Sequence, residues 1–210
     1  MGMMKWSITN QRVVPENVEI ERRFLVDVEN LPIIRASASG EAKIDQWYPP
    51  SGEIGLLPEN RSIALSGRVM IEGIPESDWK GVCELISTGS GVRIRIKGEL
   101  AFLTVKGRWV GAARAEYEWP VDVELVRQFG ETQDWVGICK TRILFPLADE
   151  LLCEVDIFSG ILDGLIIAEI ELPDQGVQLE LLGLPVWLGD EITGLSEWDN
   201  SSLAKRSHYP

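Results

Sequence analysis

Histidine is almost absent from this chain: the single example among 210 residues is His208. Serine–histidine–acid triads and cysteine–histidine dyads use a histidine as their base, so both are disfavoured. A histidine-rich metal site is disfavoured for the same reason. Any metal ion here would have to be bound by oxygen atoms, which favours hard divalent cations.

Cysteine and long apolar runs are also scarce. Cys83, Cys139 and Cys153 are an odd number at wide spacing, which indicates free thiols in a reducing compartment rather than a disulfide framework or a zinc site. No apolar run approaches the ~20 residues that span a membrane, and residues 1–6 lack the apolar core of a signal peptide. We therefore expect a cytoplasmic protein that does not engage a membrane.

Positive charge is in deficit, with 20 Lys and Arg against 33 Asp and Glu and a formal net charge of −13. This argues against a nucleic-acid partner, although it leaves room for a local basic pocket. A glycine-rich phosphate-binding loop is missing as well, so side chains would have to grip any phosphate. The length and the 45% hydrophobic content suit one globular domain with a substantial core.

What the chain does contain is alternation of charged and apolar residues near its N-terminus. Glu19, Glu21 and Arg23 occupy every second position, and in a β-strand such residues share one face. The other parity is apolar apart from Arg22: Ile20, Phe24 and Val26. This pattern predicts a strand over residues 19–26 with all of the named charges except Arg22 on one side.

Six later segments repeat the pattern, and in most of them the charges are of one sign. Like charges two residues apart on a strand repel each other, so their retention suggests a ligand or neighbouring strands that balance them. The segments are Gly91–Lys97 with Arg93, Arg95 and Lys97; Phe102–Lys106 with Lys106; Arg114–Glu118 with Arg114, Glu116 and Glu118; Lys140–Arg142; Glu154–Asp156; and Glu169–Glu171.

Antiparallel strands of this kind can close into a barrel, which removes their edges. The charges could point outward around an apolar core or inward into a polar tunnel. The near balance of acids and cations in the set suits an inward-facing lumen. Helices would then cover the apolar outer face, and the candidates are Val121–Phe129, Gln178–Leu182 and Ser196–Lys205.

A tunnel that holds Arg and Lys clusters beside Glu clusters suits a polyanion carried with divalent cations. Arg and Lys neutralise and orient phosphate oxygens. Carboxylates would repel phosphate, so they imply Mg²⁺ or Mn²⁺ between the two.

The stretch 19–26 resembles the ExExK signature of the CYTH superfamily, the triphosphate tunnel metalloenzymes. Later segments agree with that family in order along the chain. They are residues 92–95, 102–106, 114–118, 140–142, 156–160 and 168–172, and the C-terminal stretches 187–193 and 200–204.

The resemblance implies an α+β fold in which an eight-stranded antiparallel β-barrel forms a tunnel with helices packed on its outside. It also implies residue roles. The metal ligands would be Glu19, Glu21, Glu169 and Glu171, and the catalytic residues Glu19, Glu21, Arg23 and Glu171. Substrate would be bound by Arg93, Arg95, Lys106, Arg114, Lys140 and Arg142. Glu116, Glu118, Glu154 and Asp156 would also line the tunnel.

Two features depart from the family pattern. Arg23 stands where the family has lysine; arginine keeps the charge but cannot act as a base. An insertion over about residues 49–90 separates the second strand motif, at Gln46–Tyr48, from Arg93. Within it, Ile63–Leu65 and Arg68–Ile71 could pair as a hairpin. We expect an N-terminal arm at 1–16 and a single tunnel domain at 17–206.

The leading functional prediction is hydrolysis of a small-molecule triphosphate, with inorganic tripolyphosphate first, by in-line attack of a metal-activated water. One alternative is a class IV-type adenylate cyclase, but the His-Phe pair that those cyclases carry before the motif is missing from Val14–Val18. A second alternative is a non-catalytic protein that binds polyphosphate or an organic phosphate. We expect a monomer or homodimer.

Overall fold

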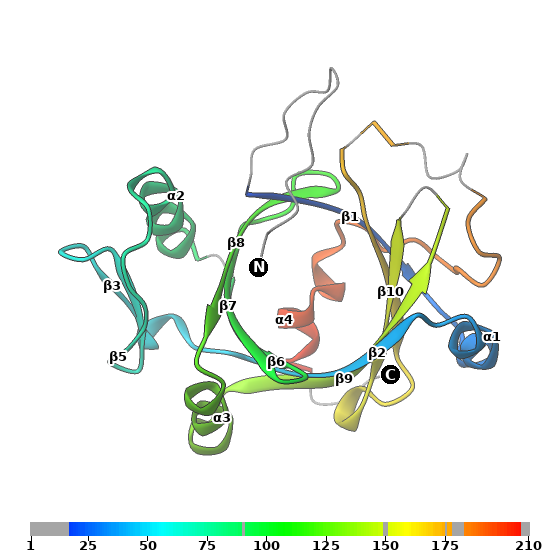
Figure 1. Ribbon diagram of the computed structural model, residues 1–210, viewed down its shortest axis with the longest axis horizontal. Coiled ribbons are helices and arrows are strands. Elements are labelled where there is room, and N and C mark those ends of the chain that lie inside the picture. Colours follow the sequence, from blue (N-terminus) through cyan, green and yellow to red (C-terminus); the bar gives the residue numbers. More distant parts are fainter. Residues whose placement is uncertain (1–16, 90, 149–150, 175, 178–182, 207–210) are drawn as a thin grey trace.

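The computed structural model describes residues 17–89, 91–148, 151–174, 176–177 and 183–206 (Figure 1). The expected arm at 1–16 and the expected helix at Gln178–Leu182 lie outside the described residues.

Eight antiparallel strands form a closed barrel, as the sequence predicted (Figure 1). Their order around the barrel is β1-β11-β10-β9-β2-β6-β7-β8, and β8 pairs again with β1. The barrel strands are β1 Val18–Leu25, β2 Gly40–Tyr48, β6 Gly91–Lys97, β7 Leu100–Lys106, β8 Ala113–Val121, β9 Val136–Pro146, β10 Leu152–Phe158 and β11 Ile166–Glu171.

The barrel turns its charged parity inward and its apolar parity outward. On β1, Ile20 and Phe24 are 3% and 6% exposed and belong to an apolar cluster outside the barrel. Ile34 of α1 (Leu31–Ala36) and Trp187 cover that cluster. Burial of this face favours the closed barrel, and it leaves the opposite parity to line the interior.

The insertion forms a small sheet and a helix beside the barrel (Figure 1). The expected hairpin is confirmed: its turn residues Ser66 and Gly67 have φ of 48° and 77°, the left-handed values that a two-residue hairpin turn requires. The sheet and helix pack on the outer faces of β6, β7 and β8 in a second apolar cluster. The elements are β3 Ile54–Leu57, β4 Ser62–Leu65, β5 Arg68–Ile71 and α2 Glu76–Ser87.

Helix α3 (Val123–Thr132) starts two residues later than the sequence suggested. Val121 is still in β8, where it pairs with Ala101 of β7. The Asp122 side chain then accepts a hydrogen bond of 2.7 Å from the Leu125 amide and caps the helix. The helix covers the outer faces of β6 and β7 as expected, through Val126 and Phe129.

The expected outer helix at Ser196–Lys205 is instead two short turns, Ser196–Trp198 and α4 (Asn200–Leu203), which lie across one end of the barrel (Figure 1). Leu203 and Ala204 pack there in a cluster with inward-facing apolar residues of the barrel: Ile138, Phe158 and Ile167. At this end of the barrel the inward-facing residues are apolar rather than charged, so α4 can pack against them and close the end. We call this closed end the plug.

Single-turn 3-10 helices complete the described elements at Val28–Asn30, Ser51–Glu53 and Gly160–Leu162. In the described part of the chain, every helix is too short or too polar to cross a bilayer.

Candidate functional site

Strand register balances most of the one-sign clusters that the sequence shows. Arg114 of β8 lies opposite Glu19 of β1, and Glu116 lies opposite Lys106 of β7. On the other side of the barrel, Glu169 lies opposite Arg23 and Asp156 opposite Arg142. Each of these four acids therefore meets a counter-charge from a neighbouring strand, as cross-strand pairing favours.

A cavity inside the barrel has a volume of about 310 Å³. We call it the charged chamber. None of the described residues lining it is aromatic, and Val18 is the sole apolar one. They are Asn17, Val18, Glu19, Glu21, Arg93, Arg95, Lys97, Lys106, Arg114, Glu116, Glu118, Arg142, Glu154, Glu169, Glu171 and Asn200.

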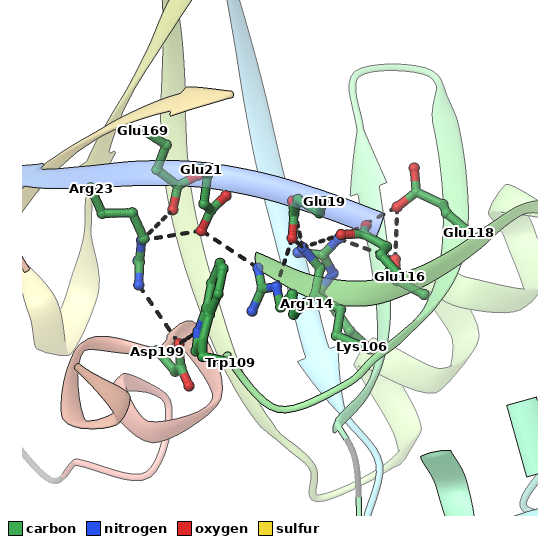
Figure 2. A network of polar contacts seen from close by, with 12 residues as sticks. Glu19, Glu21, Arg23, Lys106, Trp109, Arg114, Glu116, Glu118, Glu169 and Asp199 are labelled. Atoms are coloured by element: carbon green, nitrogen blue, oxygen red, sulfur yellow. Dashed lines mark hydrogen bonds and ion pairs between the residues drawn. The ribbon is translucent and has the colours of Figure 1, made fainter. Parts of the chain in front are cut away.

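Glu19 is held by two cations (Figure 2). Lys106 Nζ lies 2.9 Å from Glu19 Oε2, and Arg114 Nε donates to the same oxygen at 2.6 Å. Burial alone would raise the pKa of Glu19, but the charges of Lys106 and Arg114 outweigh it and hold the pKa well below its usual range. Glu19 is therefore ionised at any physiological pH.

Glu21 has a different environment, because its partner across the ladder is another acid, Glu171. Its contacts with cations are long, 3.5 Å to Arg23 Nε and 3.6 Å to Arg114 Nη2. Burial, followed by repulsion from Glu169 and Glu19, raises the pKa of Glu21 to about 8. The pKa of Glu171 is raised in the same direction by burial and by Glu19.

We call Glu19, Glu21, Glu169 and Glu171 the acidic wall, and its donor set fits Mg²⁺ or Mn²⁺. Carboxylate oxygens are the ligands that these hard cations prefer, and a cation would relieve the repulsion that raises the pKa of Glu21. Among the residues that the structure describes, no three acidic, cysteine or histidine side chains are already arranged around one point. Instead, the carboxylates form ion pairs with arginine and lysine side chains. Arg23 Nε, for example, lies 3.1 Å from Glu169 Oε1.

Arg93 and Arg95 supply hydrogen-bond donors to the charged chamber. Arg95 Nη2 lies 3.0 Å from both Glu118 oxygens, and Arg93 Nη2 donates to Thr104 Oγ1 at 3.1 Å. Nε of each arginine is buried and has no acceptor among the described residues. A buried donor without an acceptor is costly, and both side chains line the chamber, so their guanidinium groups are suited to an anion that enters it.

The charges of β9 and β10 form a closed network. Arg142 donates to Asp156 Oδ1 and Oδ2 and to Glu169 Oε2, each at 2.6 Å, and also pairs with Glu154. Lys140 pairs with Asp156, and burial lowers the pKa of Lys140 to about 8. Lys140 and Asp156 are not among the residues that line the charged chamber, and their side chains are only 2% and 0% exposed.

A second cavity of about 190 Å³ lies next to the plug. Its lining includes Arg23, together with Tyr48 and Asp199, and it shares Arg93 and Arg114 with the charged chamber. The sequence offered no signal for Tyr48, Trp109 or Asp199 as site residues, because none of the three stands in an alternating charged pattern. Thr104 could have been noted from its parity with Lys106 on the same strand.

No protein-family model matches this chain. It is 35% identical over 123 residues to an inorganic triphosphatase of Acetivibrio thermocellus, a match that covers 56% of this chain and 73% of that protein. It is 31% identical over 113 residues to an inorganic triphosphatase of Nitrosomonas europaea, covering 54% and 74% respectively.

The crystal structure of the inorganic triphosphatase NE1496 superposes with a TM-score of 0.54 and 22% identity, covering 95% of this chain and 100% of that one. This likeness concerns the fold. The identities to the two relatives, the ordered motifs and the closed barrel agree, and the chain belongs to the CYTH superfamily, the triphosphate tunnel metalloenzymes.

Proposed function

We propose that this protein hydrolyses inorganic tripolyphosphate with the help of Mg²⁺ or Mn²⁺. The observation that carries the proposal is the composition of the charged chamber, which is lined by the four carboxylates of the acidic wall and by arginine and lysine side chains. A polyanion that arrives with a divalent cation complements both sets at once. The names of the two relatives, both inorganic triphosphatases, support the same reaction class.

The lining of the charged chamber favours an inorganic substrate over a nucleotide. A purine or a thiazolium ring would need an aromatic or apolar surface on which to stack, and the described residues that line the chamber offer only Val18 as an apolar side chain. The volume of about 310 Å³ lies at the small end of ligand sites. These features weigh against adenylate cyclase activity.

The cations of the chamber would grip the phosphates and stabilise charge on the leaving group. Arg93 and Arg95 have unused Nε donors, and Lys106 and Arg114 border the acidic wall. Arg142 contributes a guanidinium whose position is fixed by Asp156 and Glu169. Lys140 supports that arrangement through its ion pair with Asp156.

The acidic wall would hold the metal ion. Glu21 and Glu171 would gain most from it, because they lie opposite each other and both have raised pKa values. When bound, Mg²⁺ or Mn²⁺ would neutralise phosphate charge and activate the attacking water. Arg23 lies beside both Glu21 and Glu169. An arginine side chain cannot serve as a base, so its proposed role is to orient these carboxylates or to bind phosphate. The three cysteines are all unpaired, which supports a reducing compartment such as the cytoplasm.

The decisive experiment is phosphate release from tripolyphosphate, ATP and thiamine triphosphate by the purified protein, with Mg²⁺, with Mn²⁺ and with EDTA. We expect release from tripolyphosphate to be fastest and to stop in EDTA. The Glu171→Gln variant should lose the activity, whereas Glu131→Gln, an exposed site on α3, should retain it.

Two outcomes would contradict the proposal. Cyclic AMP as the main product from ATP would identify a cyclase. Metal-dependent binding of tripolyphosphate without phosphate release would identify a binding protein.

A further inference from the structure

Trp109, in the loop between β7 and β8, joins two charged groups near the plugged end (Figure 2). Its ring centroid lies 4.0 Å from Cζ of Arg114. Its Nε1 donates a hydrogen bond of 2.9 Å to Asp199 Oδ1, and Arg23 Nη1 lies 3.7 Å from the same oxygen. One side chain therefore contacts, directly or through one carboxylate, the two arginines that border the acidic wall.

The backbone around Trp109 is held in place. Val110 and Ala113 exchange two backbone hydrogen bonds, of 2.8 Å and 3.3 Å, and Gly111 between them has a φ of 65°. The Gly107 amide donates to the carbonyl of Ala115 at 2.8 Å. The loop is thus the tip of the β7–β8 hairpin, which fixes the indole relative to the barrel wall.

Asp199 is positioned for the same contact. It stands at the N-cap of α4, yet its side chain makes no capping hydrogen bond. Its backbone carbonyl accepts from the amides of Ser202 and Leu203, both at 2.8 Å. An aspartate in this place ordinarily caps with its carboxylate. Here the carboxylate is turned to the indole N–H and to Arg23.

The stacked indole gives Arg114 a contact that does not depend on the acidic wall. Among the described residues, its ion-pair partners are Glu19 at 2.6 Å and Glu21 at 3.6 Å. Both carboxylates are expected to turn to the metal ion when substrate binds. The face of Trp109 would then still hold the guanidinium, through a cation–π contact that is strongest when water is excluded.

We propose that Trp109 is a positioning residue for phosphate binding and hydrolysis, which holds Arg114 with its ring face and Arg23 through Asp199 with its N–H. This rests on the proposed function for its consequence in catalysis. The two contacts use different parts of the indole, so different substitutions separate them.

The experiment compares Trp109→Phe, Trp109→Ala and the control Trp119→Phe. Phenylalanine keeps a ring beside Arg114 but loses the N–H, so kcat with tripolyphosphate should fall about 3- to 10-fold while KM changes less than about twofold. Alanine loses both contacts and should raise KM and lower kcat/KM about 30- to 100-fold. Trp119 faces outward on β8 and stacks on Tyr117, so its substitution should leave both constants within about twofold.

Asp199→Asn tests whether the indole N–H of Trp109 acts on Arg23 through the Asp199 carboxylate. The amide oxygen can still accept from the indole, but the charge that faces Arg23 is gone, so kcat should fall about as much as in Trp109→Phe. Because the two changes break one link, the double variant should be no more than about twofold worse than the poorer single variant. Fully multiplicative losses would show that Trp109 does not act through Asp199.

Calorimetric titration with Mg²⁺ and a non-hydrolysable imido analogue of tripolyphosphate separates this inference from the proposed function, because it measures binding without turnover. We expect Trp109→Ala to bind about 10-fold more weakly than the wild type, with Trp119→Phe and Trp109→Phe close to the wild type. The affinities can be compared even if the wild type releases no phosphate. That result would contradict the proposed hydrolysis but not the positioning role of Trp109. Equal affinity of Trp109→Ala and Trp119→Phe, with both variants folded by circular dichroism and with equal Tm, would overturn the positioning role.

Discussion

Two pairs of neighbouring strands in this barrel bury charge in opposite ways. On β9 and β10 every buried charge meets a counter-charge: Arg142 binds Asp156 and Glu169, and Lys140 binds Asp156. On β1 and β11 the register places Glu21 opposite Glu171, and no cation lies within 3.4 Å of Glu21 among the described residues.

Alternating charge on a strand therefore has two uses in this barrel. A matched network fixes the shape of the chamber, because buried charges without partners are costly. In a mismatched acidic pair the two carboxylates repel each other, and a bound divalent cation would remove that repulsion. We therefore expect substitutions in the two regions to divide between stability and activity.

The largest effect should come from breaking the matched network. Asp156→Ala leaves Lys140 and Arg142 buried without their shared partner, so we expect a loss of about 3–5 kcal/mol in unfolding free energy. Urea denaturation would measure it. The control is Glu154→Ala, whose side chain is 28% exposed and should cost less than about 1 kcal/mol. Similar midpoints for the two variants would contradict the comparison, and Asp156→Asn provides a milder test if the alanine variant does not fold.

The mismatched pair should respond in the opposite sense. Glu21→Gln removes a proposed metal ligand, and we expect kcat/KM to fall at least about 100-fold, or ~2.7 kcal/mol. Unfolding free energy at pH 7 should change by less than about 0.5 kcal/mol, because the pKa of Glu21 is about 8 and its carboxyl already carries a proton there. Steady-state kinetics and urea denaturation of one preparation test both parts. A marked loss of stability would show that Glu21 is structural.

The affinity for Mg²⁺ should depend on pH through Glu21. Its pKa in the folded, metal-free protein is about 8, above the reference value of 4.5, so the protonated carboxyl stabilises the fold below pH 4.5 and this contribution is lost as the pH rises through 8. Metal binding needs the ionised form, so affinity should rise about tenfold per pH unit up to about pH 8 and then level off.

Calorimetry in two buffers of different ionisation enthalpy would detect the proton released. Release should be close to one proton per ion at pH 7 and close to none at pH 9. The Glu21→Gln variant should release none at either pH. A flat affinity profile for the wild type would mean that Glu21 does not bind the metal.

The smallest effect should come from Arg23→Lys, which restores the residue type that the superfamily signature has here. Lysine keeps the positive charge beside Glu169, so we expect activity to stay within about threefold of the wild type or to rise. Arg93→Ala, which removes a chamber cation, should lower kcat/KM about 100-fold. Equal and mild effects of both would argue against phosphate binding by the chamber.

The alternation in the sequence determined which side chains share a face, because the two-residue period of a strand is a local property. Glu19, Glu21 and Arg23 do lie together, and so do Arg93 and Arg95. The roles assigned to these residues stay predictions. The hairpin at Ser66–Gly67 was also local, since turn chemistry depends on adjacent residues.

Only the tertiary structure decided which charged side chains become partners and which end of the barrel is closed. Whether Glu21 faces a cation or Glu171 depends on the register of strands 150 residues apart in the sequence, and a one-residue shift would change every pair. The contact of Trp109 with Asp199 joins two loops that carry no periodic pattern. The plug likewise rests on inward apolar residues from three strands, because burial is a property of the assembled barrel and not of any one segment.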